Sequence, residues 1–219
     1  QVLGLPQPEP IFSITQIPPQ VFKGAVTHSR SVLFVEQDSL SLAHVKTDVY
    51  AKPQMVAVVK GETFNDFSDN LDRIAAQAVA SFKQVEIKEA QKRFLRSLSK
   101  ETAFVEELGI TLKVPSLYKV GKQEKNFVWM DIQIPKGTMN LLAYAMPEDT
   151  FSADSTFVRD IIRMRDSIGE KYIPGPDVPG KKTFMITEKA FAPYVFPTEI
   201  GGKKAAEARG GWEISGYPM

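Results

Sequence analysis

The sequence contains no cysteine and only two histidines, His28 and His44. Without cysteine the chain cannot form a disulfide, a thiolate nucleophile or a cysteine-ligated metal site. The two histidines fall in different predicted elements, so neither a histidine-based metal site nor a serine–histidine catalytic pair is favoured. We therefore predict that the protein holds no metal and uses no cofactor.

Long apolar runs and an excess of one charge are also missing. No uninterrupted apolar stretch approaches the roughly 20 residues that a membrane-spanning helix needs. The 27 basic and 26 acidic side chains leave a net charge of +1. Such a balance provides no long-range attraction to phosphates, so we expect no nucleic-acid partner.

Nucleotide-binding loops and catalytic serine motifs are absent as well. The segment Gly201-Gly202-Lys203 superficially resembles a phosphate-binding loop. That motif needs an earlier glycine, where this chain has Pro197, and a hydroxyl residue after the lysine, where it has Lys204. A turn is the natural interpretation, and no G-x-S-x-G motif is found elsewhere.

The first half of the chain has the pattern of strands followed by a long helix. Alternating or continuous apolar residues predict strands at 11–17, 31–35, 45–50 and 55–59. Residues 62–108 contain neither proline nor glycine, which predicts one long helix or two joined by a small break. Thr63 and Asp66 have the spacing of a capping box at its start.

The second half repeats this coarse plan with shorter elements. We predict strands at 110–114, 127–134 and 139–146, a turn at 121–126 and a helix that ends near Lys171. Four short strands then complete the chain: 183–187, 194–196, 205–209 and 212–214. This order favours an α+β fold with mainly antiparallel sheets, one long helix in the N-terminal half and one helix in the C-terminal half.

Because both halves place strands before a helix, two related αβ sandwich units are one arrangement that the pattern allows. We place their boundary between residues 109 and 110, which gives units 1–109 and 110–219. A chain of 219 residues is long enough for either one large or two small domains.

The most suggestive polar cluster is Glu207-Ala208-Arg209-Gly210-Gly211-Trp212. In a strand, Glu207 and Arg209 share one face, and they could pair with charged residues of the preceding helix. One interpretation is a structural ion-pair network that joins helix to sheet. The other is a ligand cleft in which arginine holds an anion and tryptophan stacks on the ligand. The candidate ligand-binding residues are Arg165, Asp166, Glu207, Arg209 and Trp212.

Three functions stay open on the residues alone. The lack of nucleophile and metal motifs favours a non-enzymatic protein that binds a ligand or a protein partner. A glycan- or peptidoglycan-acting enzyme would need two facing carboxyl groups, one of them Glu207. A structural module of a larger assembly is the third.

Several segments in order resemble an uncharacterised family of envelope lipoproteins of Gram-negative bacteria, the domain of unknown function 4837. They are Leu5–Pro10, Asp48–Gln54, Arg165–Ser167, Ile173–Pro176 and Glu207–Trp212, with Gly211 where a leucine is more usual.

The resemblance implies a periplasmic or outer-membrane location and an unknown ligand or envelope protein as the partner. It also implies a lipid anchor, absent from this chain, as the only membrane contact, and a second unit that continues after Met219. The family has no assigned activity, so it supplies no catalytic residue.

Overall fold

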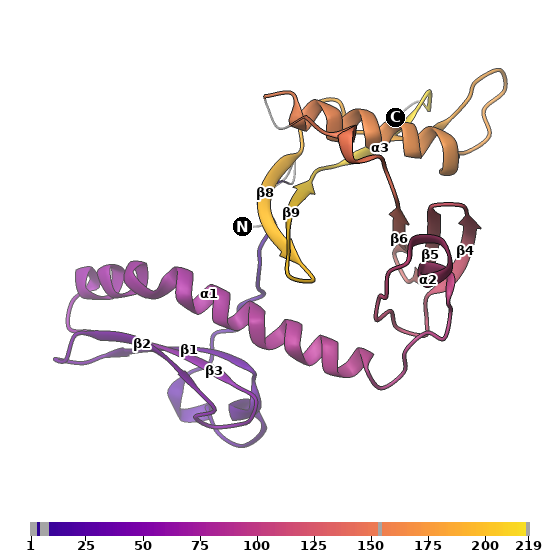
Figure 1. The fold of residues 1–219 in the computed structure, drawn as a ribbon. Coiled ribbons are helices and arrows are strands. Elements are labelled where there is room, and N and C mark those ends of the chain that lie inside the picture. Colours follow the sequence, from indigo (N-terminus) through magenta and orange to yellow (C-terminus); the bar gives the residue numbers. More distant parts are fainter. Residues whose placement is uncertain (1–3, 5–8, 153–154, 218–219) are drawn as a thin grey trace. The chain divides into compact units, whose positions relative to one another are not determined.

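The computed structural model describes residue 4, residues 9–152 and residues 155–217. The chain divides into two compact units (Figure 1). One unit comprises Gln16–Ala145, and the other joins Gln1–Thr15 to Met146–Met219. Among the described residues, no helix is both long enough and apolar enough to cross a bilayer.

The unit 16–145 begins with two short 3-10 turns, Pro19–Val21 and Gly24–His28, and a three-stranded sheet. Its strands are β1 (Ser31–Gln37), β2 (Leu42–Thr47) and β3 (Met55–Gly61), in the order β1-β3-β2. β1 runs parallel to β3, and β2 runs antiparallel to it. The predicted strands at 31–35 and 55–59 are therefore confirmed.

Helix α1 (Phe64–Phe94) lies along one face of this sheet (Figure 1). Its start is the predicted capping box, in which Asp66 N donates to Thr63 Oγ1 and Thr63 N donates to Asp66 Oδ2. The buried residues that join helix to sheet are Ala57, Val59, Ile74 and Ala78. The spacing of its apolar residues thus produces one buried stripe.

A second, short helix follows α1. Of the two predicted forms, the structure therefore shows two helices joined by a break. Helix α2 (Ala103–Leu108) ends at Gly109, whose φ of 62° is a left-handed C-cap. It packs on a three-stranded antiparallel sheet of β4 (Lys119–Glu124), β5 (Phe127–Ile134) and β6 (Gly137–Tyr144). The buried core between them is Ala103, Phe104, Val114, Val128 and Met130.

Four local predictions need correction. Residues 121–124, predicted as part of a turn, belong to strand β4, because β5 provides hydrogen-bond partners along its length. Segments 11–17 and 110–114 are not strands, since no neighbouring strand pairs with them in the described chain. The strand predicted at 45–50 lies at 42–47 and ends before Asp48, whose φ is 54°.

The second unit contains a 3-10 turn (Glu148–Thr150), helix α3 (Phe157–Tyr172) and two small antiparallel sheets. β7 (Phe184–Thr187) pairs with β10 (Trp212–Ser215), and β8 (Tyr194–Ile200) pairs with β9 (Lys203–Arg209). The fold is therefore α+β with mostly antiparallel sheets, as predicted, and β1–β3 is a parallel pair within it. The boundary proposed between residues 109 and 110 stays a prediction.

Candidate functional site

The strands β8 and β9 form a hairpin that carries two of the predicted site residues. A two-residue turn joins Ile200 to Lys203, and its glycines, Gly201 and Gly202, have φ values of 58° and 77°. Positive φ at both positions matches the right-handed twist of a tight hairpin. The turn therefore sets the register of the whole ladder.

That register places aromatic and charged side chains on one face. Tyr194 lies opposite Arg209, and Phe196 lies opposite Glu207, so all four share a face. The rings of Tyr194 and Phe196 stack with centroids 6.4 Å apart and an interplanar angle of 12°. Arg209 Cζ lies 5.1 Å from the Phe196 centroid, within the range of a cation–π contact. We call these four residues the hairpin face.

The arginine of the hairpin face is held in place by its neighbour. Arg209 Nε donates to Glu207 Oε1 at 2.7 Å, and this hydrogen bond raises the pKa of Arg209 above its ordinary value. The Arg209 and Glu207 side chains are 35% and 45% exposed, and Tyr194 is 56% exposed. The hairpin face is therefore a partly exposed surface, on which a hydrogen-bonded arginine lies beside two stacked rings.

The other predicted site residues lie elsewhere in the same unit. Asp166 Oδ1 accepts a hydrogen bond from Thr187 N at 2.7 Å, and Thr187 is paired with Trp212. Trp212 is 59% exposed. No hydrogen bond or ion pair between described residues joins Arg165 or Asp166 to Glu207 or Arg209. Asp166 thus bonds to β7 and Glu207 to Arg209, and both interpretations of these residues, the ion-pair network and the ligand cleft, stay predictions.

Sequence reasoning missed the two aromatic members of the hairpin face. Tyr194 and Phe196 stand two residues apart, and Glu207 and Arg209 have the same spacing. This alternation was a usable signal, because residues i and i+2 of a strand point to the same side. Pairing the two segments, however, required knowing that the Gly201–Gly202 turn brings them together.

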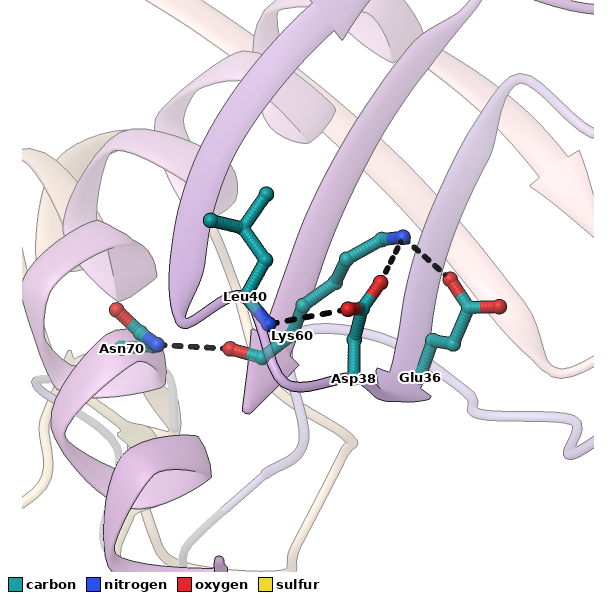
Figure 2. A network of polar contacts seen from close by, with 5 residues as sticks. All are labelled: Glu36, Asp38, Leu40, Lys60 and Asn70. Carbon is teal, nitrogen blue, oxygen red and sulfur yellow. Dashed lines mark hydrogen bonds and ion pairs between the residues drawn. The ribbon is translucent and has the colours of Figure 1, made fainter. Parts of the chain in front are cut away.

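In the first unit, Lys60 lies between two carboxylates and forms a charged cluster with them (Figure 2). Lys60 Nζ lies 2.6 Å from Glu36 Oε2 and 2.9 Å from Asp38 Oδ2. Leu40 N donates to Asp38 Oδ1 at 3.0 Å, and Asn70 Nδ2 donates to Lys60 O at 2.8 Å. The cluster joins the end of β1, the end of β3 and helix α1.

This cluster does not have the electrostatics of a glycosidase pair, which needs one carboxyl group with a raised pKa. The Leu40 amide, and then Lys60, lowers the pKa of Asp38, while Glu36 raises the pKa of Lys60. Lys60 therefore pairs with both carboxylates, and the pKa of Asp38 is lowered rather than raised. The pKa is also lowered at Asp66, Glu86, Glu89, Glu106 and Asp160.

A polar hollow of about 390 Å³ lies near the start of β1 and β3. It is lined by His28, Arg30, Ala51, Lys52, Pro53 and Glu89. Arg30 is already neutralised, because its Nε and Nη2 donate to the two oxygens of Glu86 at 2.8 Å each. The hollow has the size of a small-ligand site, but the charge of Arg30 in its lining is already balanced by Glu86.

The loop beneath this hollow is organised by one buried amide. Gln54 is 1% exposed, and its Nε2 donates to Thr27 O and Ser29 O at 2.7 Å each. Its Oε1 accepts from Tyr50 N at 2.8 Å, and its main-chain N donates to Asp48 Oδ1 at 2.9 Å. The segment 48–54 is thereby tied to the 3-10 turn that precedes β1.

Comparison with known proteins yields two family matches. Residues 97–219 match a family described as "Domain of unknown function (DUF4837)". Residues 1–95 match one described as "Domain of unknown function (DUF8532)". No curated protein and no solved structure matches the chain.

Proposed function

The chain belongs to the family of the domain of unknown function DUF4837, and on that premise we propose that it is a non-enzymatic binding protein of the bacterial envelope. Its contact surface in this proposal is the hairpin face, and its ligand is a protein partner. The observation that carries the proposal is the stack of Tyr194, Phe196 and Arg209, in which Tyr194 is exposed and Phe196 and Arg209 are half-buried.

The composition of the hairpin face favours a protein as the ligand. Tyrosine and arginine are among the residues that dominate binding energy at protein interfaces. Glu207 holds the Arg209 guanidinium over Phe196, so little side-chain entropy is lost when a partner binds. Gly4 packs against Arg209 and Tyr194 at one end of the hairpin face. A strand pair suits a broad protein surface better than a small molecule, which needs a concave site.

The hairpin itself also favours a partner. β8 and β9 pair only with each other among the described strands, and an isolated two-stranded hairpin is marginally stable in water. A partner that packs on the hairpin face would add contacts that stabilise the hairpin. The outer edges of β8 and β9 are less suited to strand addition. β8 contains Pro197 and β9 contains Lys204, and proline and lysine both discourage pairing at a sheet edge.

An envelope location is part of the proposal and rests on the family resemblance. In the resembling lipoproteins an N-terminal lipid anchor attaches the protein to the membrane. Fractionation of the native cells tests it directly. Recovery of the protein with envelope membranes, released by detergent but not by salt, supports the location, and recovery in the cytoplasm contradicts it.

A site-specific cross-linking experiment tests the binding surface. The full-length protein would carry a photoreactive amino acid at Tyr194 in its native cells, and a matched variant would carry it at Leu117, which is also largely exposed. We expect a discrete adduct from position 194 and none of the same size from 117. The adduct's protein, once purified, should bind the wild type at least about tenfold more tightly than Phe196→Ala or Arg209→Ala.

Two results would reject the hairpin face as the contact surface. One is the same set of adducts from positions 194 and 117. The other is unchanged affinity of the purified partner for Phe196→Ala, Arg209→Ala and a Leu117→Ala control.

The polar hollow favours a second candidate, binding of a small charged molecule. Lys52 and His28 are accessible there, while Arg30 is engaged by Glu86. A thermal-shift series with inorganic phosphate and acetate, on wild type and Lys52→Ala, tests this alternative. A concentration-dependent rise in Tm that Lys52→Ala removes supports it, and no difference between the two proteins speaks against it.

A further inference from the structure

Strand β1 exposes a complete main-chain edge. Arg30 O accepts from Met55 N at 2.8 Å, and Asp38 N donates to Gly61 O at 2.9 Å, so even-numbered residues direct their main-chain groups toward β3. In a parallel ladder the intervening residues then direct theirs away from it. These outward residues are Ser31, Leu33, Val35 and Gln37. Among the described residues, no main-chain hydrogen bond reaches them from another strand.

This edge lacks the features that usually block strand addition. Lysine, proline, an irregular register and a β-bulge are the common devices. The sequence of β1, SVLFVEQ, contains neither lysine nor proline, and its register with β3 is continuous. Edge strand β4, in contrast, has a register shift between Val120 and Lys122, and β8 has Pro197.

The apolar side chains of β1 are also left outside the core. Leu33 and Val35 are 49% and 56% exposed. They lie on the same face as their partners Ala57 and Val59, which are buried beneath α1. The core on this face is formed by β3, β2 and α1, with no β1 residue in it. The sheet therefore ends in an apolar strand whose outer main-chain edge is open and whose Leu33 and Val35 side chains are exposed.

We propose that β1 is a homodimer interface, at which a second copy of the chain adds its own β1 in antiparallel orientation. The two-fold axis would pass beside Phe34. Outward residues must then pair with outward residues, so Leu33 faces Val35 of the partner subunit and Ser31 faces Gln37 of the partner subunit. The two three-stranded sheets become one continuous sheet across the axis.

The sequence of β1 is complementary to itself in this register. Centring the pair on Phe34 uses all seven strand residues and forms about eight main-chain hydrogen bonds. It places Arg30 opposite Asp38 of the partner subunit, so no like charges are opposed there, although each of these side chains is already paired within its own copy. Leu33 and Val35 of the partner subunit become directly opposed apolar neighbours, which stabilises a strand pair. An isologous pairing of this kind closes after two copies.

This interface is separate from the hairpin face and stands independently of the proposed partner. All the residues that form it belong to the unit 16–145. Dimerisation would present two copies of the second unit on one assembly, and any partner of the hairpin face would then bind with two contacts instead of one.

Cysteine cross-linking tests the register, because residues 1–219 contain no cysteine that would compete with an introduced one. In the full-length protein, Phe34→Cys places two thiols across the axis, where Cα atoms of a non-hydrogen-bonded pair lie about 4.5 Å apart, within disulfide range. We expect a covalent dimer under mild oxidation. Val32→Cys, on the same face of β1, is the matched control and should remain mostly uncross-linked.

A second arm uses the exposed positions, so that a folding defect at Phe34 cannot decide the result. Chains with Leu33→Cys and Val35→Cys should cross-link when mixed and much less when oxidised separately. Equal cross-linking of every single variant, or none in the mixture, would overturn the register.

Sedimentation of the same full-length protein tests the dimer itself. We expect a monomer–dimer equilibrium in wild type and a dissociation constant at least about tenfold higher for Val35→Lys. Leu117→Lys introduces the same charge at another exposed apolar position and should leave the constant unchanged. The proposal is overturned if the wild type stays monomeric at 100-fold the concentration used for cross-linking. It is also overturned if another segment of the chain or another protein occupies the outer edge of β1.

Discussion

At the scale of single residues, Gln54 has the most demanding environment in the first unit. Its side chain satisfies two carbonyls and one amide of the main chain while almost fully buried. An amide is suited to this position because it carries both donors and an acceptor. The residue thus links the loop 48–54, the approach to β1 and the polar hollow.

Replacing this amide should therefore be costly. We expect Gln54→Ala to lower the free energy of unfolding by at least about 3 kcal/mol, because three buried main-chain groups lose their partner. Urea denaturation measures it. Gln133→Ala changes an exposed glutamine and should stay within about 0.5 kcal/mol of wild type. Equal midpoints for the two variants would show that water replaces the Gln54 amide.

Gly169 is a second residue whose identity is explained by its neighbours. It lies inside α3, and an added Cβ would come within 1.9 Å of Met185 O on β7. Glycine costs a helix about 1 kcal/mol relative to alanine, so its presence here reflects the close contact of helix and strand.

Gly169→Ala should accordingly destabilise the second unit despite its better helix propensity. We expect a loss of at least about 2 kcal/mol, since the helix or strand must shift to accommodate the methyl group. Ser167→Ala on the same helix is exposed and should be nearly neutral. Thermal unfolding followed by circular dichroism compares them, and a stabilised Gly169→Ala protein would contradict the close contact.

At the scale of elements, the start of α1 shows how a short motif defines a helix. Asp66 accepts hydrogen bonds from Thr63 N and Glu62 N, and Thr63 Oγ1 accepts from Asp66 N. These bonds lower the pKa of Asp66 below its ordinary value of 3.8, the Thr63 amide contributing most. Since the motif uses these amides itself, we do not regard this helix terminus as an anion site.

The lowered pKa predicts a pH dependence with a defined sign. A carboxyl group whose pKa is lower in the folded state stabilises that state above its unfolded value, and the stabilisation is lost as the pH falls through the folded pKa. The difference in urea midpoint between wild type and Asp66→Asn should therefore be constant near neutral pH and shrink below pH 3.8. A difference that does not change with pH would contradict the charged cap.

At the scale of the whole molecule, the division of the chain depends on α2. Ala103 and Phe104 of α2 are buried with Val128 and Met130 of β5. A boundary between residues 109 and 110 would separate these residues. The DUF4837 match instead begins at residue 97 and keeps α2 with its sheet.

Two truncated chains distinguish these boundaries. We expect residues 97–219 to unfold cooperatively, and residues 110–219 to bind an apolar dye and unfold less cooperatively, because the sheet β4–β6 loses its helix. Fluorescence with the dye and urea denaturation measure both. If the two chains behave alike, α2 contributes little and the boundary at 109 and 110 gains support.

Sequence reasoning worked where the deciding interactions are local in the chain. The capping box, the helical stretch within 62–108 and the strand at 127–134 each depend on nearby residues. It failed at 121–124, whose polar composition is that of a turn but whose partner is β5. It also did not identify the two aromatic residues of β8 that lie beside Glu207 and Arg209.

The sequence by itself therefore determined the α+β class, the positions of both main helices and most strands, because periodicity and capping act over a few residues. Only the tertiary structure decided which strands are neighbours, and hence that β1 ends a sheet with an open edge and that Tyr194 and Phe196 lie beside Arg209. Strand pairing depends on residues far apart in the chain, and no local pattern specifies which distant segment supplies the partner.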